Sequence, residues 1–129
     1  MQGYEVKIVD ASKNLSAKEK IAMKDTTNAF SLDEVIDQTP DGKLIIDVDF
    51  YVVLDVHNEK SDNVDYSKFV LVDKDGKKYV TGSEPFFTSF KGIWDEMQLD
   101  ESGEKWELIC YKMESNNYKG KQFLTCSIM

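Results

Sequence analysis

Apolar and polar residues alternate in the stretch LIIDVDFYVVLDVH, which covers residues 44–57. Every even-numbered position of this run is apolar, whereas Asp47, Asp49 and Asp55 occupy odd-numbered positions. A period of two, with many β-branched and aromatic residues, predicts a β-strand with one buried face and with exposed aspartates. Because the run exceeds the usual strand of about five or six residues, we expect it to bend or to serve two sheets in succession.

A β-hairpin is predicted after this run. The β-rich segments Tyr66–Val72 and Lys78–Thr81 are joined by an Asp-Lys-Asp-Gly turn. A type I turn with Gly76 in the left-handed conformation would set Leu71 opposite Tyr79. Shorter alternating runs predict three further strands, namely an edge strand at Tyr4–Ile8 and two final strands at Trp106–Tyr111 and Phe123–Ile128.

Two segments in the first third of the chain allow alternative interpretations. Ser12–Asp25 consists of good helix formers, and Ser16 with Glu19 spells a capping box, so the segment is either a short helix or a mobile insertion. At Ala29–Gln38 the apolar spacing suits a strand, whereas a second Ser-x-x-Glu capping box suits a helix. We expect the strand.

The sum of these elements is seven or eight short strands with at most one helix, in residues 12–25. This pattern is typical of an all-β antiparallel sandwich, with a closed barrel as the alternative. A chain of 129 residues fits one domain, residues 1–129, and can bury a core without metals or many disulfides.

Composition narrows the classes of partner. With 24 acidic and 16 basic residues the net charge is −8, which repels phosphate backbones and makes nucleic acid an unsuitable partner. No apolar run approaches the roughly 20 residues of a membrane span, and the first residues lack the pattern of a signal peptide. We therefore expect either a cytosolic protein or an exported one whose leader and anchor have been removed.

Residues 43–113 carry a combination of strand and turn motifs. They are the strand FYVVLDV at residues 50–56 that closes on Asn58, the pattern Phe69-x-Leu71-x-Asp73-x-x-Gly76-x-x-Tyr79, and a turn at Leu99–Glu104 that leads into Trp106–Tyr111. In combination these motifs resemble telokin-like, immunoglobulin-like domains of unknown function that are common in surface lipoproteins of Gram-positive bacteria. The resemblance implies an immunoglobulin-like sandwich and an extracytoplasmic, non-catalytic module. It transfers no functional residue, because the motif residues are structural.

Candidate chemistry is sparse. His57 is the only histidine, so a triad or a histidine metal site would need it, but a surface histidine is the simpler interpretation. Asp73-x-Asp75-Gly76 resembles the start of a calcium loop without its downstream ligands and suits a turn better. No glycine-rich phosphate loop, Cys-x-x-Cys or Gly-x-Ser-x-Gly occurs. We therefore expect no enzyme, metal or cofactor; the enzymatic alternative is a carboxylate-dependent hydrolase that uses Asp47 and Asp49.

A binding surface is expected on the loops of the sandwich, where recognition residues commonly lie. The aromatic segment Phe86–Trp94 and the acidic segment that follows it supply the candidates, which are Phe87, Trp94, Asp95 and Glu96. The aromatic residues could equally belong to the core. The expected function is a binding or structural module of a cell-surface protein that contacts an unknown protein or cell-envelope component. The alternative is a cytosolic inhibitor or interaction protein.

The two cysteines, Cys110 and Cys126, share the apolar faces of the last two strands. A hairpin turn centred near Tyr118 would place them directly opposite each other. We expect a disulfide if the protein is exported, and two buried reduced thiols if it is cytosolic.

Overall fold

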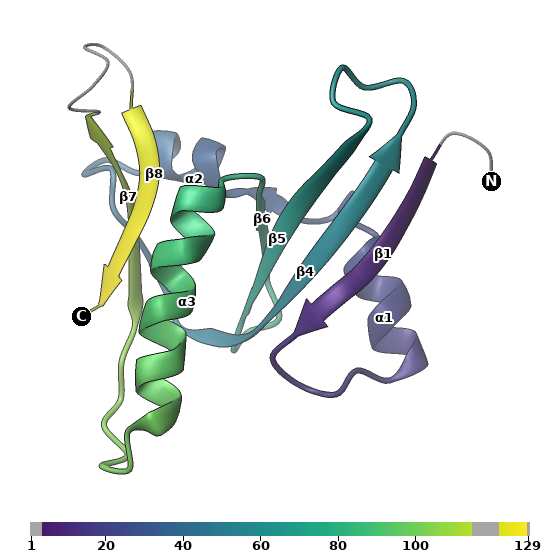
Figure 1. The fold of residues 1–129 in the computed structure, drawn as a ribbon. Coiled ribbons are helices and arrows are strands. Elements are labelled where there is room, and N and C mark those ends of the chain that lie inside the picture. Colours follow the sequence, from purple (N-terminus) through teal and green to yellow (C-terminus); the bar gives the residue numbers. More distant parts are fainter. Residues whose placement is uncertain (1–3, 115–121, 129) are drawn as a thin grey trace. The chain divides into compact units, whose positions relative to one another are not determined.

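The computed structural model describes residues 4–114 and 122–128 (Figure 1). Within this part of the chain, eight strands form two sheets and three helices accompany them. The fold is therefore β-rich with the predicted number of strands, whereas the expectation of at most one helix is wrong. The elements in order are β1 (Tyr4–Ala11), α1 (Ala17–Lys24), β2 (Phe30–Ser31), α2 (Leu32–Gln38), β3 (Leu44–Ile46), β4 (Val48–Asn58), β5 (Asp65–Asp73), β6 (Lys78–Thr81), α3 (Glu84–Leu99), β7 (Leu108–Glu114) and β8 (Gln122–Ile128).

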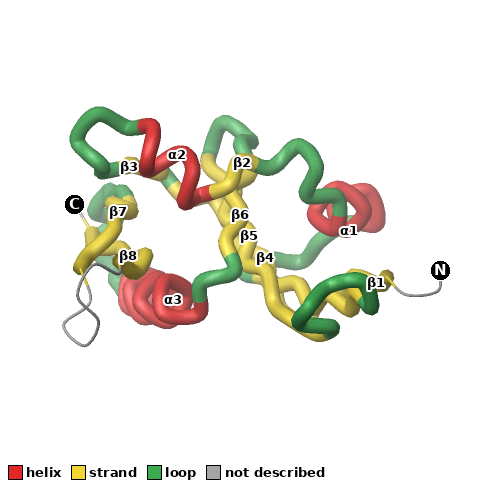
Figure 2. Tube along the Cα trace, turned by 90° about the horizontal axis from the view of Figure 1, so that it is seen from above, coloured by secondary structure: helices red, strands yellow, loops and turns green. Residues whose placement is uncertain are grey.

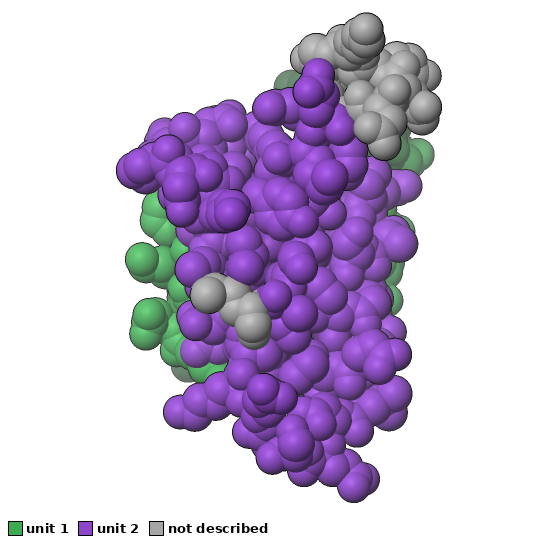
Figure 3. Space-filling model, turned by 90° about the vertical axis from the view of Figure 1, so that its left-hand side faces the viewer, with its two compact units in different colours: residues 1–31, 48–82 green, residues 32–47, 83–129 purple. Residues whose placement is uncertain are grey.

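The chain divides into two compact units, which are coloured separately in Figure 3. Unit 1 comprises Met1–Ser31 and Val48–Gly82, and unit 2 comprises Leu32–Asp47 and Ser83–Met129. Each unit has its own sheet, β1-β4-β5-β6-β2 in unit 1 and β3-β7-β8 in unit 2. That residues 1–129 form a single domain stays a prediction.

The long alternating run does serve two sheets in succession. Its first residues form β3 in unit 2 and its remainder forms β4 in unit 1, with Asp47 between the two strands. The even-numbered side chains from Ile46 to Val56 are buried, and Asp47, Asp49 and Asp55 are exposed, as predicted, whereas Leu44 at the start of the run is only half-buried. Two odd-numbered residues, Tyr51 and Val53, are buried as well, so the middle of β4 is apolar on both faces.

The sheet of unit 1 confirms the predicted hairpin and the predicted edge strand. β5 pairs antiparallel with β6, Leu71 lies opposite Tyr79, and Gly76 has a φ of 88°. β1 is the outermost strand and pairs antiparallel with β4. At the other edge the two residues of β2 pair in parallel with β6.

Helix α1 covers one face of the unit 1 sheet (Figure 2). Its capping box forms as predicted: the Glu19 backbone N–H donates to Ser16 Oγ at 3.2 Å, and the Ser16 N–H donates to Glu19 Oε1 at 3.0 Å. Met23 attaches the helix to the sheet by joining a buried apolar cluster. The other members of this cluster are Phe50, Val52, Leu54, Val70 and Val72.

Two helices replace predicted non-helical segments. In the segment 29–38, for which a strand was expected, only β2 is extended and α2 begins directly after Ser31. The aromatic segment and the start of the acidic segment, for which loops were expected, form helix α3. The helix begins there because Ser83 caps it by accepting the Phe86 N–H at 3.2 Å and because Pro85 suits the first turn. Helix α3 packs along β8 (Figure 1). Among the described residues, no helix is long and apolar enough to cross a membrane.

Leu54 provides a test of the unit 1 core. Its side chain is fully buried in the Met23 cluster, so Leu54→Ala should lower the free energy of unfolding by about 2–5 kcal/mol, through lost burial and the remaining cavity. Ile21 on α1 is 71 % exposed, and Ile21→Ala should change this free energy by less than about 0.5 kcal/mol. Urea denaturation measures both. Equal effects of the two substitutions would contradict the assigned core.

Candidate functional site

The residues predicted to bind a partner all lie on α3, not on loops. The rings of Phe87 and Trp94 are half-buried, and each lies 5.9 Å from the Phe90 ring between ring centroids. Phe90 is fully buried, as is Phe86. The aromatic segment is thus the apolar stripe of a helix, and two of its four rings belong to the core.

The two acidic candidates face different surroundings. Asp95 accepts a hydrogen bond from Lys91 Nζ at 2.7 Å, one helical turn away. Glu96 borders a hollow of about 500 Å³ between α3 and β8 whose apolar walls include Ile93, Met97 and Ile128. The four predicted residues therefore do not form one site. Two are aromatic rings that contact the core, Asp95 forms an ion pair, and Glu96 borders a hollow.

The other sequence candidates take part in local hydrogen bonds. His57 Nδ1 lies 2.7 Å from Asp65 Oδ1 on the neighbouring strand, and this hydrogen bond raises the pKa of His57 above its usual 6.5. Asp73 Oδ1 accepts backbone N–H groups at 2.9 and 2.8 Å and so closes its turn, as predicted. Among the described residues, no group of three or more His, Cys, Asp or Glu is arranged to hold a metal ion.

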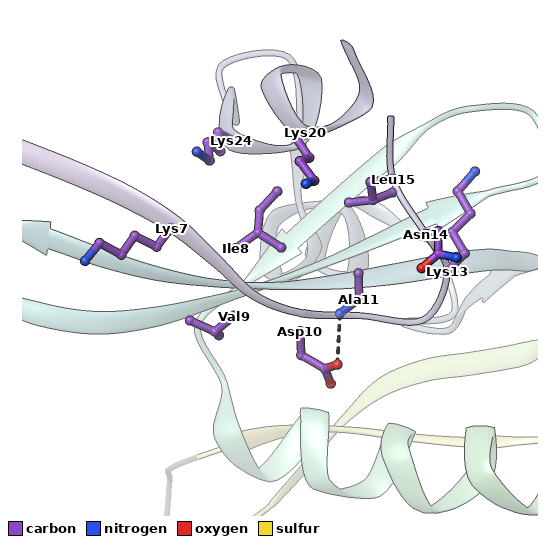
Figure 4. Close-up of a pocket in the computed structure, with 10 residues that line it drawn as sticks. All are labelled: Lys7, Ile8, Val9, Asp10, Ala11, Lys13, Asn14, Leu15, Lys20 and Lys24. Atoms are coloured by element: carbon purple, nitrogen blue, oxygen red, sulfur yellow. Dashed lines mark hydrogen bonds between the residues drawn. The ribbon is translucent and has the colours of Figure 1, made fainter. Parts of the chain in front are cut away.

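A basic hollow lies in unit 1 between β1 and α1 (Figure 4). Its volume is about 820 Å³. Lys20 and Lys24 project from α1 above Ile8, and Leu15 lies beside them. The remaining lining residues are Lys7, Val9, Asp10, Ala11, Lys13 and Asn14. We call this feature the lysine hollow; it combines an apolar floor with four ammonium groups.

The four lysines are not equivalent. Lys13 Nζ lies 2.9 Å from Glu19 Oε2, and it stands 4.1 Å from the centre of the Phe50 ring. The Ser16 backbone N–H and the Lys13 side chain lower the pKa of Glu19 to about 2, so this acid stays ionised and neutralises Lys13. Lys7 Nζ lies 3.8 Å from Glu5 Oε1. In contrast, Lys20 and Lys24 form no ion pair with a described carboxylate.

The carboxylate that lines the hollow is held away from these two lysines. Asp10 turns to the opposite side of β1 from Lys20 and Lys24 (Figure 4). There its Oδ1 accepts the Ala11 N–H at 2.9 Å, and its Oδ2 accepts the Tyr51 hydroxyl at 3.3 Å. Lys20 and Lys24 are one helical turn apart on one face of α1, where two like charges repel each other. An anion placed between them would relieve this repulsion.

Local charge could have indicated from the sequence that residues 4–24 form a basic segment, but not that they line a hollow. Residues 4–24 contain five lysines and three acidic residues, whereas the whole chain has 16 basic and 24 acidic residues. Averaging the charge over the chain hides this basic segment. The topology then adds what the local count does not show, namely that Lys7 on β1 and Lys24 on α1 line the same hollow.

The sequence matches no protein-family model, and neither a curated protein nor a solved structure is similar to it.

The cysteines lie in unit 2 on neighbouring strands. Cys110 is directly opposite Cys126 in the antiparallel pair of β7 and β8, as predicted, although the expected turn centre at residue 118 lies outside the described residues. Both are free thiols in this structure. Burial raises the pKa of both thiols, that of Cys126 to about 12, so neither is a reactive thiolate at neutral pH.

The His57–Asp65 hydrogen bond should make stability depend on pH. Because the pKa of His57 is raised in the folded state, its contribution is fully present below about pH 6.5 and is lost as the pH rises through the folded pKa. His57→Gln should therefore lower the free energy of unfolding at pH 5.5 and have little effect at pH 8.5. Denaturation at both pH values measures this. A loss of the same size at both would show that the charge on His57 is not responsible.

The register of Cys110 and Cys126 predicts a disulfide under oxidising conditions. Directly opposed residues have Cα atoms about 4.5–5.5 Å apart, within the range that a disulfide spans. Closing a loop of about 15 residues should stabilise the fold by roughly 3 kcal/mol. Alkylation under denaturing, non-reducing conditions followed by intact-mass measurement should add no alkyl group after oxidative refolding. Two added groups would contradict the prediction, and Cys126→Ser provides the one-thiol control.

Proposed function

We propose that this chain is a non-catalytic binding module that accepts an anionic group of its partner in the lysine hollow. The observation that carries the proposal is that Lys20 and Lys24, neither paired with a described acid, line one hollow with the apolar side chains of Ile8 and Leu15. An ammonium group binds carboxylate or phosphate oxygens through charge-assisted hydrogen bonds. The apolar floor would add contact area for the part of the ligand that carries the anion.

The proposal includes an immunoglobulin-like, telokin-like fold and a location outside the cytoplasm. The resemblance of residues 43–113 to domains of bacterial surface lipoproteins supports both. The opposed positions of Cys110 and Cys126 also suit an oxidising compartment. The partner would then be a protein or another component of the cell envelope. A signal peptide with a lipid-anchored cysteine upstream in the native gene would support this location, and the cytosolic inhibitor remains the alternative without one.

The hydrolase alternative has less support from the aspartates of the alternating run. Asp55 accepts a hydrogen bond from Ser67 Oγ at 3.2 Å across the β4–β5 pair, which gives it a structural role. Asp47 and Asp49 are exposed at the ends of β3 and β4. Carboxylates on an open sheet face more often pair with cross-strand neighbours than take part in hydrolysis.

Neutralising Lys20 and Lys24 tests the proposed function. The double variant Lys20→Gln/Lys24→Gln should weaken the binding of a short oligoglutamate or of tripolyphosphate about tenfold at low ionic strength, because two ion pairs are lost. The binding of the unmodified protein should also weaken as salt is added. Fluorescence anisotropy with labelled polyanions measures both effects.

The matched control is Lys18→Gln. Lys18 is an exposed residue of the same helix and does not line the lysine hollow. Lys18→Gln removes one positive charge, as does each of the single variants Lys20→Gln and Lys24→Gln, and affinity should change less than twofold. An equal loss of affinity in the control and in the double variant would show that the effect comes from the net charge of the protein and not from the lysine hollow. Failure of the unmodified protein to bind either polyanion at low salt would overturn the proposed function.

A further inference from the structure

We infer that the anionic group is carried by an extended acidic peptide that adds to the open edge of β1; this inference rests on the proposed function and names its partner. β1 is the outermost strand of the unit 1 sheet, and in the described residues only β4 pairs with it. An edge strand presents alternate N–H and C=O groups that have no partner in the sheet. A peptide strand that binds there satisfies these groups through its own backbone.

The regular part of the edge lies at the beginning of β1. Tyr4 to Ile8 pair with β4 without interruption, and the register shifts between Ile8 and Asp10. Val9, at this irregularity, is 53 % exposed. Pairing with β4 resumes at Asp10 after this shift, so Tyr4–Ile8 is the longest uninterrupted part of the edge and the part alongside which an added strand would pair.

The lysine hollow begins at this edge. Lys7 and Ile8 belong to the regular part of β1 and also line the hollow, with Lys20 and Lys24 above Ile8 (Figure 4). A strand about 4.8 Å beyond β1 would place every second side chain on the same face as Ile8. Acidic side chains at those positions would lie below the two ammonium groups. The backbone then supplies affinity, and the alternate carboxylates supply specificity.

Nucleic acid also carries anions, but the chain suits it less well. Residues 4–24 hold five of the 16 lysines and only three of the 24 acidic residues, so the rest of the chain is strongly acidic and the net charge of the protein is −8. A long phosphate backbone that left the hollow would meet repulsion from the acidic remainder of the chain. Phosphates also offer no backbone donors and acceptors in the spacing of a β-strand, so the open edge would stay unused.

Binding of a synthetic peptide tests the inference. The peptide has the length of β1 and alternates glutamate with threonine, and two derivatives carry N-methyl groups on the glutamate or on the threonine residues. Only one set of amides in a paired strand points to β1, so one derivative should bind at least about tenfold more weakly and the other should bind like the parent. Lys20→Gln/Lys24→Gln should weaken the parent peptide about tenfold, and Lys18→Gln should not.

The outcomes separate the inference from the function on which it rests. Equal affinity of both N-methylated derivatives would overturn strand addition while the anion-binding function stands. Binding of a single-stranded oligonucleotide or of inorganic phosphate, with no binding of the peptide, would overturn the peptide as partner. If that binding depends on Lys20 and Lys24, the proposed anion-binding function still stands. No binding of any anionic probe would overturn both. Loss of affinity in only one N-methylated derivative, together with dependence on Lys20 and Lys24, would establish that the peptide binds as an added strand beside β1.

Discussion

The register of β4 is the constraint on which unit 1 depends. The middle of this strand is apolar on both faces, since Val52 and Tyr51 are both buried, so hydrophobicity there does not by itself distinguish one register from the next. The carboxylates of Asp49 and Asp55 do distinguish the registers, because both are exposed only in the observed one. A slip of one residue would turn both toward the face that holds the apolar cluster of Met23, where an unpaired charge costs several kcal/mol. The register of β4 therefore accounts for the positions of Asp49 and Asp55.

The lysine hollow follows from this register. β1 pairs with β4 so that Ile8 lies opposite Leu54, and Met23 attaches α1 to the same apolar cluster. The last turn of α1 is capped from the sheet, because Lys78 Nζ donates to the carbonyl oxygens of Ala22 and Asp25 at 2.9 Å each. Since Lys78 satisfies these carbonyls, Lys24 is not needed there and remains available to the hollow. The geometry of the hollow therefore depends on core packing as much as on its own lysines.

The sequence predicted elements whose pattern is local and regular. A period of two identified the run that forms β3 and β4, the Asp-Gly turn identified the hairpin with Gly76, and the spacing of Ser16 and Glu19 allowed α1 as one of two alternatives. Helix α3 was not predicted, because serine and proline near its start are also typical of a turn. A serine cap followed by proline is also how helices begin, and the aromatic rings then recur one turn apart at positions 86, 90 and 94.

The candidate site could not be predicted for a different reason. Its residues come from β1, from the following loop and from α1, and only the position of α1 on the sheet brings Lys20 and Lys24 over Ile8. The predicted candidates Phe87 and Trp94 were chosen because aromatic residues are common in binding sites. The same residue types also form the apolar stripe of a buried helix, and no local pattern distinguishes these two uses.

The charge of the whole protein does not exclude an anionic partner for this hollow. At physiological ionic strength charges are screened over about 8 Å, so most of the 24 acidic residues do not act on a ligand between Lys20 and Lys24. The nearer acids are engaged, Glu19 with Lys13 and Asp10 with the Tyr51 hydroxyl. A short anion would therefore experience mainly the two unpaired ammonium groups, whereas a long polyanion would also meet the acidic surface. The same acidic excess that repels nucleic acid would in this way limit the hollow to short acidic segments, and screening it with salt should reduce both affinity and this selectivity.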